Sequence, residues 1–163
     1  MARVLAVYIF MRHGEAVGVD VAGSDEERWL TERGREDVEL VAMLLPVRPR
    51  VVYSSPLRRA RETAEIVARL YGAKVTVAEQ LEPGRFSVEA LQELGPEPDS
   101  VLVGHAPSMW RVVSALIGGG DVVIPAGGAA IVEAEELERG MARLLELVTP
   151  RAARTALETI CPR

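Results

Sequence analysis

Two histidines and a few arginines are the residues of this chain whose placement indicates chemistry. His13 and His105 each follow a predicted strand and lie beside a glycine. Arg12 directly precedes the first histidine, and the pair Arg58 and Arg59 follows another predicted strand. Guanidinium groups bind two phosphoryl oxygens at once, and an imidazole can act as a nucleophile or stabilise charge. Together these residue types indicate a site for chemistry on a phosphoryl group.

Other uses of these residues are less consistent with the sequence. Both histidines and Glu15 could supply ligands for a catalytic zinc ion. Arginines at the same place would repel a dication, so the sequence favours an anion and predicts no metal. Lys74 is the only lysine, which excludes a P-loop, and no Rossmann glycine fingerprint follows the first strand. A phosphate site without these motifs favours phosphoryl chemistry over nucleotide binding.

Strand and helix signals alternate along the chain. Apolar runs predict strands at residues 4–11, 50–54, 74–77, 100–103, 122–124, 129–134 and 143–148. Caps, prolines and glycines predict helices at residues 31–45, 55–70, 87–94 and 107–117. This pattern predicts one α/β domain over residues 1–163, a three-layer sandwich with a mostly parallel central sheet, helices on both faces and no cap domain. Residues 150–163 are predicted to be a weakly ordered or packing tail, weakly helical at best.

The predicted sheet explains how distant residues can meet. In open α/β sheets the ligand crevice lies beyond the carboxyl ends of the strands. We therefore expect the segments that follow Met11, Tyr53 and Val103 to share one rim. Helices that begin near Pro56 and Pro107 would add backbone donors and partial positive charge at that rim.

Net charge, apolar runs and cysteine content limit the classes of partner and the cell compartments that fit this sequence. The net charge of −5 is spread along the chain, which argues against a nucleic-acid surface. No apolar run is long enough to span a bilayer, so no membrane role is expected. Cys161 is the only cysteine, which excludes an internal disulfide and favours a cytoplasmic location. The oligomeric state is left open.

Four motifs, in order, resemble the histidine phosphatase, or phosphoglycerate-mutase-like, superfamily. They are Arg-His-Gly-Glu at residues 12–15, Leu-Thr-Glu-Arg-Gly at 30–34, Ser-Ser-Pro-Leu-Arg-Arg-Ala-Arg-Glu-Thr-Ala at 54–64 and Val-Gly-His at 103–105. The resemblance spans residues 3 to about 117. The Arg-His-Gly triplet alone is a weak signal, whereas the ordered set is highly specific.

The resemblance implies a role for each residue. His13 would be the nucleophile that becomes phosphorylated, Arg12 and Arg59 would clamp the phosphoryl oxygens, and His105 would stabilise charge in the transition state. Arg59, rather than its neighbour, directly precedes the alanine of the motif, and adjacent helical residues point about 100° apart. Glu15 would orient a neighbouring arginine or remain a partly exposed loop carboxylate. No cofactor is implied.

One departure from the family pattern bears on the substrate. Many relatives carry a glutamate acid after the third strand, where this sequence has Pro83. Glu82 or Glu79 could substitute, although neither is in register. A short chain with Leu-x-Pro-Gly at this point resembles the SixA-like phosphohistidine phosphatases. Imidazole, with a pKa of about 6.5, leaves far more easily than an alkoxide, so a site without a dedicated acid suits a phosphoramidate.

The sequence therefore supports three hypotheses. The first is a metal-independent phosphohistidine phosphatase that acts on phosphorylated proteins. The second is a phosphomonoesterase for a small phosphorylated metabolite, of the sugar phosphate or alpha-ribazole phosphate type, with Glu79 or Glu82 as the acid. The third is a non-catalytic phosphate-binding module on the same fold, which the complete set of site residues disfavours.

Overall fold

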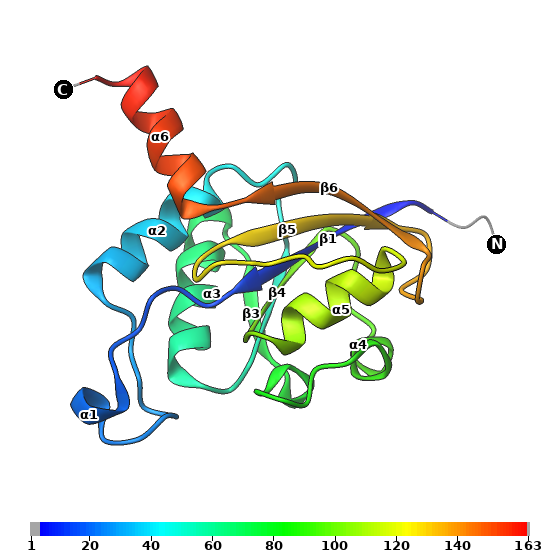
Figure 1. Cartoon of the computed structure of the whole chain (residues 1–163), viewed down its shortest axis with the longest axis horizontal. Coiled ribbons are helices and arrows are strands. Elements are labelled where there is room, and N and C mark those ends of the chain that lie inside the picture. Colours follow the sequence, from blue (N-terminus) through cyan, green and yellow to red (C-terminus); the bar gives the residue numbers. More distant parts are fainter. Residues whose placement is uncertain (1–3, 163) are drawn as a thin grey trace.

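A six-stranded mixed sheet forms the centre of the molecule. The computed structural model describes residues 4–162. The strands are β1 (Ala6–Arg12), β2 (Val51–Ser54), β3 (Lys74–Val77), β4 (Ser100–Gly104), β5 (Ala129–Ala134) and β6 (Ala142–Val148). They lie in the order β3-β2-β4-β1-β5-β6 (Figure 1). The first four in this order are mutually parallel, whereas β5 is antiparallel to both β1 and β6. The predicted α/β class is confirmed, with an antiparallel pair at one side.

Helices cover both faces of this sheet, as the sandwich prediction requires. The helices α2 (Glu32–Ala42), α3 (Arg58–Tyr71) and α6 (Pro150–Ile160) pack on one face. The helices α4 (Val88–Leu94) and α5 (Ser108–Leu116) pack on the other (Figure 1). Alternate residues of a strand point to opposite faces, so Phe10 contributes to the α5 side while Ile9 and Met11 contribute to the α2 and α3 side. The run that begins at Ala6 is thus buried on both faces.

Short helical segments fill two of the connections. A four-residue helix, α1 (Val19–Ala22), lies between β1 and α2, and a 3₁₀ turn, η1 (Glu79–Leu81), follows β3. Within residues 4–162 no inserted domain covers the carboxyl end of the parallel strands. In this same part of the chain, no helix combines the length and apolarity needed to cross a bilayer.

Two predicted elements were wrong. Residues 122–124 form no strand, because this segment lies along α5 and its backbone bonds to side chains there. Residues 150–160 form a regular helix instead of a weakly helical tail. Thr149 caps it by accepting from the Ala152 amide, and Pro150 occupies the first turn, where its missing N–H costs no hydrogen bond.

The helix α6 packs onto the body only at its beginning. Pro150 and Ala153 are buried, and Arg154 forms an ion pair with Asp37 of α2. Its later residues extend away from the sheet (Figure 1). The packing part of the prediction for this tail therefore describes its first turns only.

Candidate active site

The carboxyl ends of β1, β2 and β4 bring the predicted site residues together. Met11 and Ser54 are both in register with Val103. Beyond the strands, the His13 amide donates to the Gly104 carbonyl at 3.1 Å, so the ladder continues into the loops. The expectation that three segments share one rim is confirmed.

His13 has one ring nitrogen held by the backbone and the other directed at an arginine. Nδ1 lies 2.7 Å from the Gly14 carbonyl oxygen, which can only accept, so Nδ1 carries the hydrogen. Nε2 is then the acceptor of a hydrogen bond from Arg59 Nε at 3.3 Å. This tautomer leaves the lone pair of a buried imidazole facing the guanidinium groups.

The electrostatics of the site keep His13 neutral. Burial lowers its pKa to about 4. The hydrogen bond to Gly14 opposes this shift, and the positive charges of Arg59 and Arg12 add to it. At neutral pH Nε2 is therefore unprotonated, and its lone pair can act as a nucleophile once the hydrogen bond from Arg59 is released.

His105 lies beside it, with ring centroids 5.2 Å apart. Its Nε2 is 2.8 Å from Ser55 Oγ, whereas its Nδ1 is buried without a partner. The tautomer in which Ser55 donates to Nε2 carries the ring hydrogen at Nδ1, where an incoming anion can accept it. Burial is the main cause that lowers the pKa of His105 to about 3, and the nearby His13 and Arg59 contribute.

The two predicted clamp arginines have different surroundings. Arg59 is 4% exposed, and its Nη1 and Nη2 bond to the backbone oxygen of Asp25 at 2.7 Å and its carboxylate at 3.2 Å. Arg12 donates from Nη1 to the Ile124 carbonyl at 3.4 Å and leaves its buried Nε without a partner. Burial lowers the pKa of both side chains, which makes an added anion favourable.

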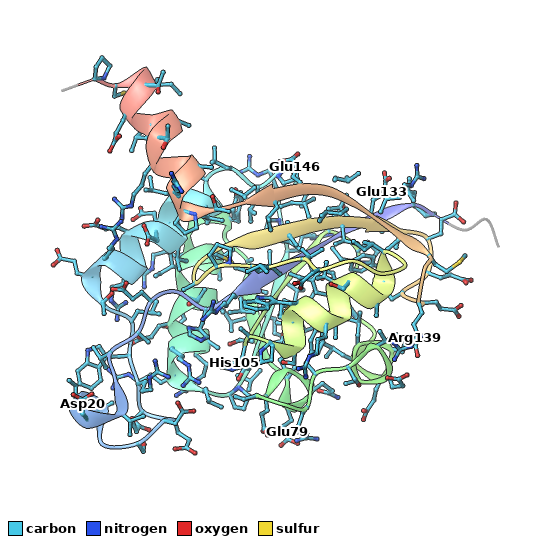
Figure 2. All side chains as sticks on the ribbon, viewed as in Figure 1. Asp20, Glu79, His105, Glu133, Arg139 and Glu146 are labelled. Atoms are coloured by element: carbon cyan, nitrogen blue, oxygen red, sulfur yellow. The ribbon has the colours of Figure 1, made fainter. Side chains whose placement is uncertain are left out.

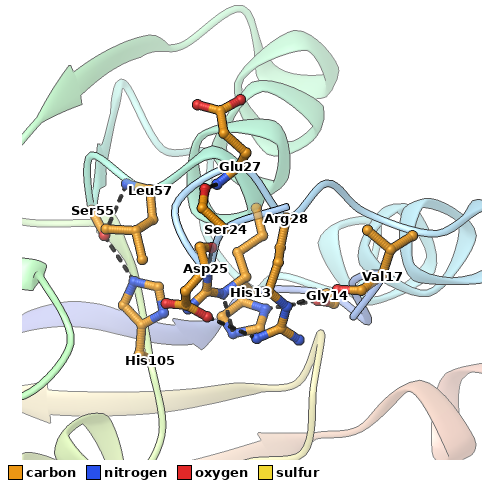
Figure 3. A network of polar contacts seen from close by, with 11 residues as sticks. His13, Gly14, Val17, Ser24, Asp25, Glu27, Arg28, Ser55, Leu57 and His105 are labelled. Atoms are coloured by element: carbon orange, nitrogen blue, oxygen red, sulfur yellow. Dashed lines mark hydrogen bonds and ion pairs between the residues drawn. The ribbon is translucent and has the colours of Figure 1, made fainter. Parts of the chain in front are cut away.

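Sequence reasoning missed Asp25 and Arg28, which the loop before α2 brings to the site. The Asp25 carboxylate bridges Arg59 and Arg28, and each of the two bonds is 3.2 Å long. Arg28 Nε also donates to the Val17 carbonyl at 2.7 Å. Figure 3 shows Asp25 and Arg28 close to His13. The available signal was an Asp-x-x-Arg sequence just before the Leu-Thr-Glu-Arg-Gly motif.

Glu62 anchors this loop to α3. Its Oε2 accepts from the Leu30 amide at 2.7 Å, and its Oε1 pairs with Arg58 at 3.3 Å and Arg35 at 3.1 Å. Arg58 also lies over the Trp29 ring, 5.2 Å from its centroid. Arg58 is thus used outside the phosphoryl site, as expected, while Arg59 points inward.

Close packing explains the threonine and glycines of the motifs. Thr63 Oγ1 donates to the Arg59 carbonyl at 2.8 Å and accepts from the Gly14 amide at 3.1 Å, which ties α3 to the His13 loop. A Cβ on Gly34 would lie 2.2 Å from the Glu15 carbonyl oxygen. The start of α2 can approach this loop only without that side chain.

The three candidate carboxylates pair with groups other than the two histidines. Glu15 accepts from Thr31 Oγ1 at 2.8 Å and forms no ion pair with an arginine of residues 4–162, whereas Asp25 and Glu62 do. The side chains of Glu79 and Glu82 are 77% and 32% exposed and pair with Arg85. Glu79 lies at the edge of the molecule in Figure 2.

The assembled groups form an anion site. Three arginines (Arg12, Arg28 and Arg59) lie near enough to His13 to lower its pKa, His105 lies beside it, and Asp25 is the only carboxylate among residues 4–162 that bonds into this cluster. Over the same residues, no three His, Cys, Asp or Glu side chains are grouped so that they could hold a metal ion. Such a cluster can bind a dianion, offer it a nucleophile and neutralise charge as it develops.

The comparisons with known proteins agree with this arrangement. A family model described as the histidine phosphatase superfamily (branch 1) matches residues 8–88. The chain belongs to this superfamily, and its relatives support phosphatase activity. An uncharacterised protein of Picosynechococcus sp. is 35% identical over 117 residues, which cover 66% of this chain and 70% of that protein.

Among solved structures, the chain is similar to SixA phosphatases. It matches the protein histidine phosphatase SixA complexed with tungstate with a TM-score of 0.75 and 28% identity, over 90% of this chain and 98% of that one. A mycobacterial glucosyl-3-phosphoglycerate phosphatase shares the fold, with a TM-score of 0.65 and 19% identity over 86% of this chain and 97% of that one. The predicted resemblance to SixA-like members of the superfamily is confirmed.

Proposed function

We propose that the chain is a metal-independent phosphohydrolase that acts through a covalent phosphohistidine at His13. The observation that carries this proposal is the Nε2 atom of a buried neutral imidazole, fixed by the Nδ1 hydrogen bond to Gly14 and aimed at Arg59. Nε2 attacks phosphorus, the bond to the leaving group breaks, and that group departs with its electron pair. Water then attacks the phosphohistidine, a proton is lost, and inorganic phosphate and neutral His13 result.

The remaining groups hold the transferred phosphoryl group. Arg59 turns from Nε2 and from Asp25 to the phosphoryl oxygens, and Arg12 offers its unpartnered Nε from another side. His105 donates from its free Nδ1 to the third oxygen. Because the loose transition state spreads charge over these oxygens, positioned donors in a buried site supply most of the rate.

We propose phosphohistidine on a protein as the substrate. Among residues 4–162 neither predicted acid is buried, because Glu79 is exposed, Glu82 is half-buried and both pair with Arg85. This arrangement offers no dedicated acid to protonate a leaving alkoxide. An imidazole leaving group needs less help from such an acid. The absence of an inserted domain over residues 4–162 leaves the strand ends open to a side chain on a protein surface. The lone cysteine supports activity in the cytoplasm.

A phosphomonoesterase acting on a small metabolite is the second candidate. It is favoured by the shared fold with the mycobacterial glucosyl-3-phosphoglycerate phosphatase. In that case Glu82, the less exposed of the two rim carboxylates, would leave Arg85 and protonate the leaving oxygen. A phosphate-binding module without turnover is a third candidate, and it would bind phosphate without hydrolysing any ester.

One comparison separates these candidates. The values of kcat/KM for a phosphohistidine protein and for a panel of sugar phosphates are measured with wild-type protein, His13→Ala and Glu82→Gln. The proposal expects preference for phosphohistidine, loss of all turnover in His13→Ala and little effect of Glu82→Gln. Preference for an ester that Glu82→Gln abolishes would support the second candidate, and binding without turnover would support the third.

A further inference from the structure

Arg12 is a half-buried cation whose Nε atom is fully buried and which has no acidic partner among residues 4–162. No carboxylate of residues 4–162 forms an ion pair with it, whereas Arg59 has Asp25. Its Nη1 bond to the Ile124 carbonyl, 3.4 Å long, is at the weak end of the range, and its Nε has no partner at all. A long side chain held by a single weak bond would lose much rotamer entropy on ordering. Some other contact must fix it.

Trp110 of α5 supplies that contact. The Arg12 guanidinium carbon lies 5.8 Å from the centroid of the Trp110 ring, within the range of a cation–π interaction. The indole Nε1 donates to the Ile124 carbonyl at 2.9 Å, and this is the same oxygen that Arg12 uses. One backbone oxygen therefore fixes both the ring and the guanidinium.

Trp110 also borders a hollow in the surface. Trp110 lines a cavity of about 420 Å³ together with Pro107, Arg111, Ser114 and the loop at Gly120, whereas Arg12 does not line it. A small side chain at position 110 would enlarge this hollow and leave the guanidinium without its aromatic neighbour. Water could then solvate Arg12 and compete with an anion for it.

We infer that Trp110 is the positioning residue for Arg12 in phosphoryl binding. An aromatic face orients a cation without presenting an anion that the substrate must displace. Arg12 thus keeps its full charge and its free Nε for the phosphoryl group. Arg59, in contrast, must release the Asp25 carboxylate before it can bind that group. This inference rests on the clamp role proposed for Arg12 above.

The test measures the inhibition constant of inorganic phosphate and kcat/KM for an aryl phosphate. Trp110→Leu removes the aromatic face, Trp110→Phe retains it without the indole N–H, and Arg111→Leu is the matched control at the adjacent position, which also lines the hollow. We expect Trp110→Leu to weaken phosphate inhibition about tenfold and Trp110→Phe to weaken it no more than about threefold. Arg111→Leu should leave the constant unchanged.

Coupling to Arg12 distinguishes positioning from general damage to the fold. In an Arg12→Ala background, Trp110→Leu should change the inhibition constant less than about twofold, because the partner of the ring is already gone. The same tenfold loss in that background would overturn the inference. A Trp110→Leu single variant that phosphate inhibits as strongly as it inhibits the wild type would overturn it too. If Trp110→Leu does not fold, Trp110→Met replaces it with the same expected results.

Failure of the proposed function gives a different result. If Arg12→Ala itself binds phosphate and turns over substrate like the wild type, the clamp role of Arg12 is wrong. If Arg12→Ala is impaired but Trp110→Leu is not, the clamp role stands and only the inference about Trp110 is overturned.

Discussion

The site has two parts that are built in different ways: a floor formed by His13, Arg59 and His105, and an outer rim formed by Glu79 and Glu82. On the floor His13, Arg59 and His105 are 8%, 4% and 3% exposed, and each has a ring or guanidinium nitrogen bonded to a partner supplied by the fold. On the rim Glu79 and Glu82 form ion pairs with Arg85 alone among residues 4–162, and their side chains are 77% and 32% exposed. The floor is organised before a ligand arrives, so the fold specifies the phosphoryl group more tightly than the group that carries it.

The largest effect should come from the floor, at the proposed nucleophile. His13→Ala removes the atom that accepts the phosphoryl group, and we expect kcat to fall by at least about 10³-fold. Single-turnover hydrolysis of an aryl phosphate measures this loss. Circular dichroism should show an unchanged fold, because the neighbouring backbone bonds remain. A folded variant with near wild-type turnover would contradict the assignment.

Arg59 should come next. Arg59→Ala removes charge and donors from the phosphoryl oxygens, and we expect a loss of about 10²- to 10³-fold in kcat/KM. Arg58→Ala is the matched control, because the adjacent side chain points at Trp29 and Glu62. It should stay within about threefold of wild type. Equal losses in the two variants would mean that the effect comes from disturbing α3.

The buried imidazoles make a prediction about pH. The pKa of His13 is lowered to about 4 and that of His105 to about 3, so both should remain neutral well below the ordinary value of 6.5. The chain has only two histidines, so proton NMR of the ring hydrogens can follow each one. A titration of either ring near pH 6.5 would contradict the buried, arginine-flanked environment.

The same shifts fix the sign of the stability change. Unfolded histidines bind protons near pH 6.5, whereas these folded ones do so only near pH 4 and below. The unfolded state therefore binds more protons between these values, and the free energy of unfolding should fall as the pH drops from about 6.5 towards 4. Urea unfolding at several pH values measures this. His105→Gln should reduce the slope if this variant folds.

The smallest effects are expected on the rim. Glu79→Gln and Glu82→Gln each remove a solvent-accessible charge that is paired with Arg85, so kcat/KM for phosphohistidine should change less than about threefold. The same two variants assayed with a sugar phosphate serve as the comparison. A loss above about 10²-fold for either one with phosphohistidine would assign it the role of general acid and remove the contrast between rim and floor.

Sequence reasoning could locate the floor because regular elements position it. Strand ends fix where His13 and His105 must lie, and helical geometry separates Arg59 from Arg58. Asp25 and Arg28 were missed because the loop between α1 and α2 is placed by bonds to side chains such as Glu62, and periodicity does not record such bonds.

The two wrong predictions of secondary structure, at residues 122–124 and 150–160, have physical causes. The helix α6 could have been predicted, because Thr149 and Pro150 are standard signals for a helix start. The segment at residues 122–124 reads as a strand because Val122 and Ile124 alternate towards the core. Its backbone groups instead form hydrogen bonds with the side chains of Ser114, Trp110 and Arg12. These bonds depend on the position of α5, which the local sequence does not show.

The most direct test of the central claim is to trap the covalent intermediate. Wild-type protein is mixed with excess aryl phosphate, quenched in alkali within the first turnover and digested for mass spectrometry. The account predicts one phosphoryl group, stable to alkali and labile to acid, on His13, and none on the His13→Ala variant. Turnover with the phosphoryl group on another residue such as Ser55, or with no labelled protein at any time, would contradict it.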